Sequence, residues 1–379
     1  MPCSMLGART SPEPARDPQE GPSLTCVTTA WVPAALRPGL HDPTLVVELA
    51  ARLPDAPAEL LEIVRLTLEA LDCALVFASP PLLADHLRWR TTRLGTLDQT
   101  EQEPALDALV LDLLAGRVDQ RTLAELRALW EAAKAVVADS PSGQAAVLAP
   151  GRAHDYLEAA VHGRRDEAVR IVREALFDER GVAEIVTEIL EASQRELGRR
   201  WERGEITIAE EHQATAITQL SLSLLYPRLV TDRLWHEGRQ SPPHVVAATA
   251  QAEGHEVGLR MVTDLLEHDG WRTTYLGADL PPDEVVGHAA LQRADVLAVS
   301  ATMPAQLRAV HRIGELLRGD PRCAGIRLLV GGRPFQVDPG LAGRVGADGS
   351  AATCQEAVEV CRAWAGRGMP APRSPSPQN

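Results

Sequence analysis

The stretch HVVAATAQAEGHEVGL, residues 244–259, decides the fold of the C-terminal half. It begins with a short apolar run typical of a buried strand and passes through a polar loop. It continues into VGLRMVTDLLEHDG, whose apolar residues recur three or four positions apart, as in a helix. Downstream, the runs WRTTYLGA, ADVLAVSA, IRLLVGG and GADGSAA alternate with further helical segments. Short strands alternating with helices predict an α/β fold over residues 243–366, with a parallel sheet covered on both faces.

Two helical regions precede this sheet. Residues 151–238 contain four segments of helical period, and we expect two shorter helices followed by two long ones in a compact four-helix unit. Residues 44–140 contain further helical segments and predict an N-terminal all-α domain. Residues 1–43 and 367–379 are rich in Pro, Gly, Ser and Thr without sustained periodicity, and we interpret them as disordered tails.

The composition argues against several functional classes. The formal net charge is −14, and residues 45–140 carry sixteen acidic and nine basic side chains, which disfavours nucleic-acid binding. No apolar run approaches the ~20 residues that span a bilayer, and no secretory signal pattern is found. The six cysteines lack CxxC spacing, which indicates reduced thiols and no structural zinc. We therefore expect a cytoplasmic protein that contacts neither nucleic acid nor membrane.

Three short motifs follow predicted strands, where ligands bind in a parallel α/β sheet. They are E-x-H-x-x-G, S-x-T and G-G, separated by 41 and 28 residues. Their order and spacing resemble the cobalamin-binding fingerprint D-x-H-x-x-G, S-x-L, G-G of methionine synthase, corrinoid methyl carriers and B12-dependent photoreceptors. The resemblance implies a flavodoxin-like (Rossmann-like) domain that binds cobalamin and its cobalt. The residues that carry it are Glu253, His255, Gly258, Ser300, Thr302, Gly331 and Gly332.

The first motif carries the metal ligand by this resemblance. It implies that the cofactor's dimethylbenzimidazole base leaves cobalt and that His255 replaces it as the lower ligand. Glu253 then fixes the tautomer of the imidazole and raises the basicity of the coordinating nitrogen. Glu stands here where the family usually has Asp.

The other two motifs are expected to hold the displaced nucleotide tail. Ser300 would donate a hydrogen bond to the benzimidazole nitrogen, and Thr302 replaces the usual Leu. Gly258, Gly331 and Gly332 would let the backbone pass close to the tail, where a Cβ would clash.

The four-helix unit resembles the helical cap that covers the upper face of the corrin in methionine synthase and its relatives. Its sharpest feature is Trp201, followed after nine residues by Glu211 and His212. A T-x-x-E capping box at Thr207 starts the second long helix, so these residues flank one turn and can face one cavity together with Ile208. The pattern W-x9-EH resembles light-sensing cobalamin regulators, and it implies a pocket for an adenosyl group.

These resemblances favour a sensory or regulatory protein, not itself an enzyme and without catalytic side chains, that binds adenosylcobalamin between cap and α/β domain. A response to light stays open, because Glu202 stands where the best-studied regulators have a second histidine ligand. The expected MerR-type helix-turn-helix is also absent from the sequence pattern, so we expect a protein partner or self-association through residues 44–140. The alternative is a corrinoid methyl-carrier protein, carrying methylcobalamin in a cobalamin-dependent methyltransferase system.

Overall fold

The structure is a computed structural model, and all the residues it describes belong to one compact unit of the chain. The two predicted tails lie outside the described residues, as do parts of the predicted N-terminal domain. Among the described helices, none is both long and apolar enough to cross a bilayer. The described residues are 48, 51–52, 58–96, 103–139, 148–178, 180–233 and 242–366.

The C-terminal domain is built on five parallel strands in the order β2-β1-β3-β4-β5, which confirms the predicted α/β fold. The strand order reverses between β1 and β3, and ligands of such sheets bind beside this reversal. Thr249 pairs with Ser300 and Ser300 with Gly331, so β1, β3 and β4 end at the same level. The strands are β1 His244–Thr249, β2 Arg272–Tyr275, β3 Val296–Ser300, β4 Arg327–Gly331 and β5 Gly349–Ala351.

Alternate strand residues enter two separate cores, one on each face of the sheet. On one face Val245 and Ala298 pack with α11 and α16, and on the other Val246 and Leu297 pack with α12 and α13. Because both faces are covered, every residue of β1 is buried. The helical elements are α11 Val257–His268, α12 Pro282–Leu291, η4 Pro304–Gln306, α13 Leu307–Gly319, η5 Pro321–Cys323, α14 Arg333–Val337, α15 Leu341–Arg344 and α16 Cys354–Gly366.

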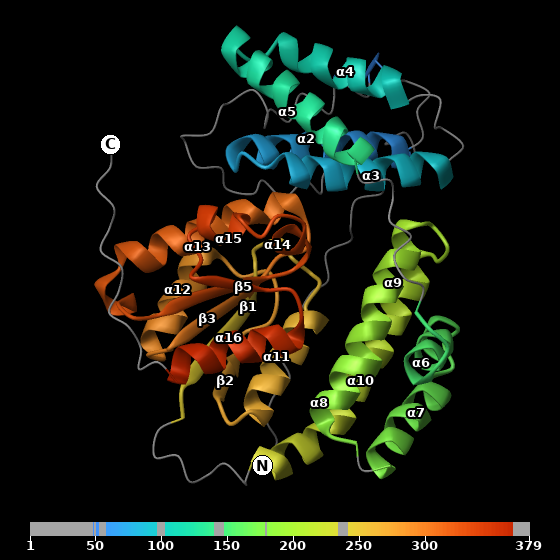
Figure 1. The fold of residues 1–379 in the computed structure, drawn as a ribbon, viewed down its shortest axis with the longest axis vertical. Coiled ribbons are helices and arrows are strands. Elements are labelled where there is room, and N and C mark those ends of the chain that lie inside the picture. Colours follow the sequence, from blue (N-terminus) through green and yellow to red (C-terminus); the bar gives the residue numbers. More distant parts are fainter. Residues whose placement is uncertain are drawn as a thin grey trace, which may run out of the picture. The chain divides into compact units, whose positions relative to one another are not determined.

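The four-helix cap precedes the sheet and packs on the α11 side (Figure 1). Its second long helix starts at the predicted capping box: the Thr207 amide donates to Glu210 Oε2 at 2.7 Å, and the Glu210 amide donates to Thr207 Oγ1 at 3.2 Å. A positive φ of 67° at Gly204 shapes the turn before it. The cap consists of α6 Arg152–Val161, α7 Arg165–Phe177, α8 Val182–Ile185, η2 Val186–Glu191, α9 Ala192–Glu202 and α10 Ile208–Arg233.

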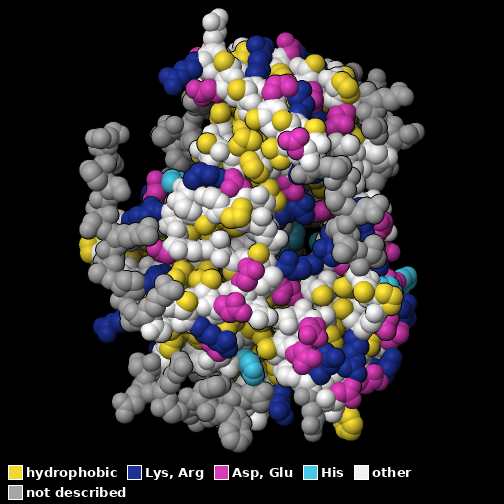
Figure 2. Space-filling view, in the orientation of Figure 1, with side chains coloured by type: hydrophobic (Ala, Val, Ile, Leu, Met, Phe, Trp, Pro, Cys, Tyr) yellow, Lys and Arg dark blue, Asp and Glu magenta, His cyan; other side chains and the backbone are white. Residues whose placement is uncertain are grey.

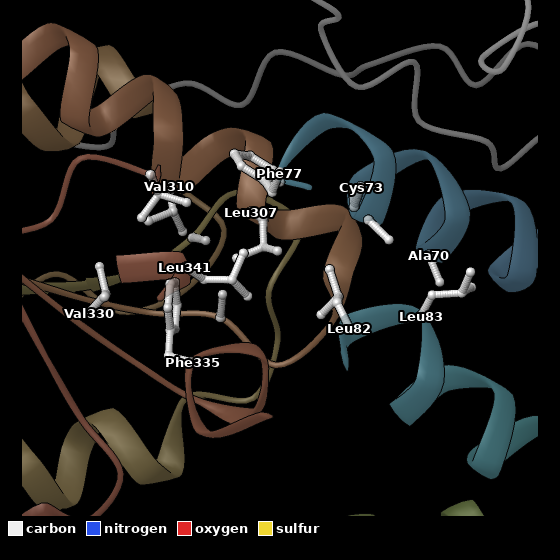
Figure 3. Packing of buried hydrophobic residues seen from close by; sticks show 14 of the residues in the cluster. Ala70, Cys73, Phe77, Leu82, Leu83, Leu307, Val310, Val330, Phe335 and Leu341 are labelled. Carbon is white, nitrogen blue, oxygen red and sulfur yellow. The ribbon is translucent and has the colours of Figure 1, made fainter. Parts of the chain in front are cut away.

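Helices α2 to α5, which we call the N-terminal module, pack on the opposite side. Phe77 and Leu82 of the module share a buried cluster with Leu307 and Val310 of the α/β domain (Figure 3). The module and the cap therefore occupy different faces of the sheet. The module consists of α2 Ala58–Val76, α3 Pro80–Thr96, α4 Glu103–Ala115 and α5 Gln120–Asp139.

Candidate cofactor-binding site

A cavity of about 750 Å³ lies at the carboxyl ends of the strands, beside the reversal in strand order. It is walled by the α/β domain, by the cap and by helix α3 of the N-terminal module. All the predicted site residues except Glu253 line it, and Glu253 is fully buried next to it. The lining residues from the prediction are Trp201, Ile208, Glu211, His212, His255, Gly258, Ser300, Thr302, Gly331 and Gly332.

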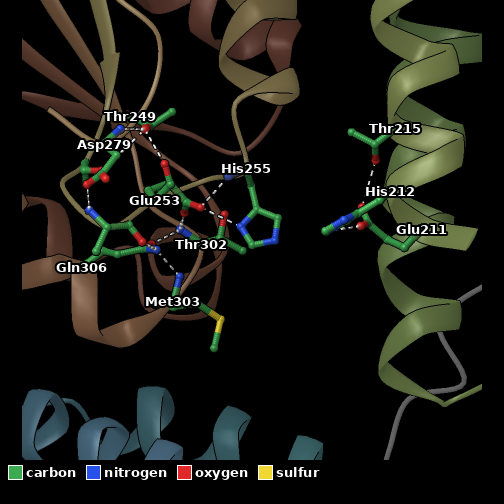
Figure 4. A network of polar contacts seen from close by, with 12 residues as sticks. Glu211, His212, Thr215, Thr249, Glu253, His255, Asp279, Thr302, Met303 and Gln306 are labelled. Carbon is green, nitrogen blue, oxygen red and sulfur yellow. Dashed lines mark hydrogen bonds and ion pairs between the residues drawn. The ribbon is translucent and has the colours of Figure 1, made fainter. Parts of the chain in front are cut away.

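Glu253 holds His255 in one orientation. Its carboxylate accepts hydrogen bonds from the His255 amide at 2.7 Å, from His255 Nδ1 at 2.6 Å and from the Thr302 amide at 2.5 Å. An ionised carboxylate can only accept, so Nδ1 carries the proton and Nε2 of the neutral ring keeps its lone pair. The ring points toward α10, with Glu211 and His212 across from it (Figure 4).

The same contacts shift the pKa values of both groups. Burial alone would raise the pKa of Glu253, but the hydrogen bonds and the charge of His255 hold it below its ordinary value. The hydrogen bond from Glu253 raises the pKa of His255 against the opposing effect of burial. Glu253 therefore increases the basicity of the imidazole that faces the cavity.

The loop between β1 and α11 is fixed by polar residues that sequence reasoning missed. Thr249 Oγ1 donates to the Glu253 carbonyl at 2.8 Å, and Asp279 Oδ1 accepts from the Ala252 amide at 2.8 Å. Gln306 Nε2 donates to the Ala252 carbonyl at 3.0 Å. These side chains lie at the ends of neighbouring strands or just beyond them, and that position is the signal by which they could have been found.

Ser300 and the glycines of the three motifs differ in what surrounds them. Ser300 Oγ is buried and has no hydrogen-bond partner within the described part of the chain. A Cβ at Gly332, whose φ is +104°, would lie 1.9 Å from the Ala301 carbonyl oxygen. A Cβ at Gly258 would meet no protein atom within 4 Å. A side chain at this position would therefore clash with a bound ligand and not with the protein. The space beside Gly258 belongs to the cavity.

The cap places its predicted residues around the opposite wall. Glu211 accepts a hydrogen bond from Thr215 Oγ1 at 2.8 Å, which fixes its carboxylate within the wall. His212 lies 3.5 Å from Glu211 and is 72% exposed, so it marks an open edge of the cavity. The structure thus brings Trp201, Glu211 and His212 to one cavity, as the spacing W-x9-EH predicts.

Helix α3 adds a third set of lining residues that the sequence did not reveal. Leu82, Asp85, His86 and Trp89 all line the cavity, although the N-terminal region was predicted as a separate domain. Their spacing is that of one helix face, but it does not differ from the pattern of any amphipathic helix. No local signal in the sequence could have connected them with the other lining residues, which are more than 100 positions away.

The open groups fit cobalamin. Within the described ranges, no cluster of three or more His, Cys, Asp or Glu side chains could hold a metal ion by itself. A corrin ring brings its own nitrogen ligands, so one imidazole with a free Nε2 suffices. The unpaired Ser300 hydroxyl offers a hydrogen bond to a buried ligand, and Gly258 leaves room beside the backbone for its tail.

Comparisons with known proteins agree with this geometry. Residues 243–360 match a family model described as B12 binding domain, and residues 152–226 match a second model of the same description. The chain is 24% identical over 208 residues to the dimethylamine corrinoid protein 3 of Methanosarcina acetivorans and 26% identical over 206 residues to the dimethylamine corrinoid protein of Methanosarcina barkeri. These matches cover 55% and 54% of this chain, and 94% and 92% of the relatives.

Among solved structures, the monomethylamine corrinoid protein of Methanosarcina barkeri aligns with a TM-score of 0.48 and 22% identity, over 54% of this chain and 94% of that one. The expectation of a sensory or regulatory protein is wrong, because curated relatives of the chain are corrinoid proteins, several of them named for methylamines. The expected B12-binding domains are confirmed, by one family model over the α/β region and by the other over the four-helix cap. Residues 152–226 and 243–360 are the B12-binding domains of this chain, and cobalamin is its cofactor.

Proposed function

We propose that this chain is a corrinoid methyl-carrier protein, which holds cobalamin and passes a methyl group between partner methyltransferases. The observation that carries the proposal is the Glu253–His255 pair, placed at the reversal of strand order and facing a cavity between two matched B12-binding domains. The names of the two dimethylamine corrinoid proteins described above support a carrier, because the chain matches them along more than nine tenths of their length.

In this proposal the chain positions the cofactor and controls access to it. Bound cobalamin supplies a cobalt–carbon bond through which a methyl group is taken up and given away. His255 Nε2 would hold the cobalt, and Glu253, which keeps the proton on Nδ1, would raise the basicity of the ring toward the metal. Ser300, whose buried hydroxyl has no partner among the described residues, would donate a hydrogen bond to the nucleotide tail of the cofactor.

The cap residues act on the other side. Trp201 and Glu211 would shield the bound cofactor from water on the cap side, and the exposed edge at His212 would leave an approach for a partner methyltransferase. A carrier needs such an edge, because the methyl group must be reached by two different partners. The proposal takes residues 151–238 as the cap domain and residues 243–366 as the α/β domain.

The test is a pair of absorption titrations of the full chain with methylcobalamin and adenosylcobalamin, for the wild type and for His255→Ala. We expect methylcobalamin to bind at least as tightly as adenosylcobalamin. We expect His255→Ala to weaken its binding by roughly 10-fold or more, since loss of an outer partner of a metal ligand already has an effect of that size. The control is His162→Ala, which removes an exposed histidine of the cap outside the cavity and should change nothing.

A second measurement follows the methyl group. The bound cofactor is reduced, methylated with methyl iodide and offered a thiol acceptor, while absorption and mass spectrometry record cofactor and methyl thioether. A carrier retains the cofactor through this cycle. A more than tenfold preference for adenosylcobalamin, with a change of oligomeric state after green light, would contradict the proposal.

A further inference from the structure

The N-terminal module has no role assigned by the comparisons. Both family matches begin at or after residue 152, whereas the module spans residues 58–139. Its acidic side chains disfavour nucleic-acid binding, and its place in the structure suggests a different use. The module contacts both of the other parts of the chain close to the cavity.

The module is docked on the α/β domain by polar as well as apolar contacts. Asp72 of α2 forms an ion pair with Arg308 of α13, and both side chains are almost completely buried. The Phe77 ring meets the His311 ring edge to face, with centroids 5.8 Å apart. Removing one partner of a buried ion pair leaves an uncompensated charge, so this contact holds the module in a defined position.

Helix α3 turns one continuous face toward the cavity. Leu82, Asp85, His86 and Trp89 follow at positions i, i+3, i+4 and i+7, and all four line it. Thr67 Oγ1 donates to the Ile63 carbonyl, so the 2.9 Å contact between Thr67 Oγ1 and His86 Nε2 makes Nε2 the donor. The rings of His86 and Trp89 lie 5.2 Å apart, which fixes this part of the wall.

The same helix is tied to both walls of the cavity. Arg333, next after the Gly331-Gly332 motif, binds Asp85 through two hydrogen bonds of 2.7 and 3.0 Å and Glu202 of the cap through one of 2.5 Å. The guanidinium of Arg93 lies 5.9 Å from the centroid of the Trp201 ring. Figure 2 shows the surface hollowed in this region, with basic and acidic side chains around the hollow.

We propose that α3 is a third wall of the cobalamin site, that its cavity face contacts the bound cofactor, and that Arg333 fastens the module over it. Trp89 offers apolar area to the corrin, and Asp85 and His86 offer hydrogen-bonding groups to the amide side chains at its rim. Docking of the module and binding of cobalamin then favour each other, and by linkage the coupling is reciprocal.

This inference rests on cobalamin binding and does not depend on methyl transfer. A chain that binds cobalamin but fails to carry methyl groups would leave it intact. If the wild type does not bind cobalamin, both this inference and the proposed function are contradicted. The experiments below use the full chain and methylcobalamin as the probe.

The first experiment compares the affinity of the wild type with that of Trp89→Ala and Asp85→Asn. Each variant removes one contact from the cavity face or from the Arg333 bridge, and we expect the Kd for methylcobalamin to rise roughly tenfold. Glu131→Gln is the control, because it removes a carboxylate of an exposed ion pair in the same module, outside the cavity. It should bind as the wild type does.

The second experiment measures amide hydrogen exchange of residues 80–96 in the wild type with and without methylcobalamin. Slower exchange in α3 on binding supports the coupling, and it needs no variant that could fail to fold. Wild-type affinity in both variants would overturn the proposal. Unchanged exchange in α3, when exchange at residues 250–258 slows, would overturn it as well.

Discussion

If His255 holds cobalt as proposed, replacing Glu253 by Gln should weaken that bond without removing any side-chain volume. The carboxylate now accepts three N–H groups, and Gln offers one oxygen and one NH₂. If the oxygen serves His255, the NH₂ faces the Thr302 amide and two donors meet. A buried donor without an acceptor costs ~1–3 kcal/mol, and outer ligands of this kind change metal affinity roughly 10–100-fold.

The pH dependence of cobalamin binding gives this prediction a second readout. A protonated Nε2 cannot bind cobalt, and Glu253 raises the pKa of His255 above its ordinary 6.5. In the wild type, ligation is therefore complete at high pH and is lost as pH falls through that raised pKa. In Glu253→Gln the pKa of His255 returns toward 6.5. Methylcobalamin binding at pH 8 should therefore be weaker, and the pH at which binding is lost on acidification (the acid limb of the profile) should be lower.

The assay is an absorption titration with methylcobalamin at several values between about pH 5 and pH 9. Glu253→Asp is the matched variant, because it keeps the charge and is the residue that the fingerprint usually has. It should retain more of the affinity and of the raised acid limb than Glu253→Gln does. Equal affinity and an unchanged acid limb in Glu253→Gln would refute the argument that this carboxylate tunes His255.

Two glycines and one histidine give further predictions. Gly332→Ala should lower the free energy of unfolding by at least ~2 kcal/mol, because the new Cβ at positive φ meets the Ala301 carbonyl; urea unfolding measures this. Gly258→Ala meets no atom within 4 Å, so it should leave apo stability unchanged or slightly higher while weakening methylcobalamin binding; an apo loss equal to that of Gly332→Ala would contradict the geometry. Burial lowers the pKa of His86 from 6.5 to about 3, so the unfolded chain binds the extra proton between these values. The free energy of unfolding is therefore unaffected by His86 above about pH 6.5 and falls with acidification below it, by up to ~1.4 kcal/mol per pH unit. His86→Gln should make the free energy of unfolding less dependent on pH, as measured by urea unfolding at pH 7 and pH 5.

The α/β fold and the residues at its edge were predictable because both depend on short-range regularities. A change from period 3.6 to short apolar runs identifies the strands, and a parallel sheet brings the residue after each strand to one edge. Ser300 and Gly331 lie side by side in the structure for that reason. The motif spacing adds a family resemblance that identifies the cofactor, and both family models confirm it.

The functional assignment failed at the cap for a physical reason. An indole with a Glu-His pair supplies apolar area and hydrogen bonds, and these suit the upper face of a corrin whatever group is bound there. Trp201, Glu211 and His212 all line the one cavity. The pattern W-x9-EH nevertheless could not distinguish an adenosyl pocket from a methyl site, and the relatives favour the second.

The contribution of α3 could not be predicted, because it depends on contacts across the whole chain. Asp85 and Arg333 are 248 positions apart, and neither belongs to a recognisable motif. The two faces of the sheet carry separate cores, so the module and the cap are each anchored independently and approach each other at the carboxyl ends of the strands. Arg333 is placed there by the same Gly332 turn that shapes the cavity, and it can bind Asp85 and Glu202 together because both helices reach this edge. A change in the cavity that moves this turn must therefore act on both helical units at once.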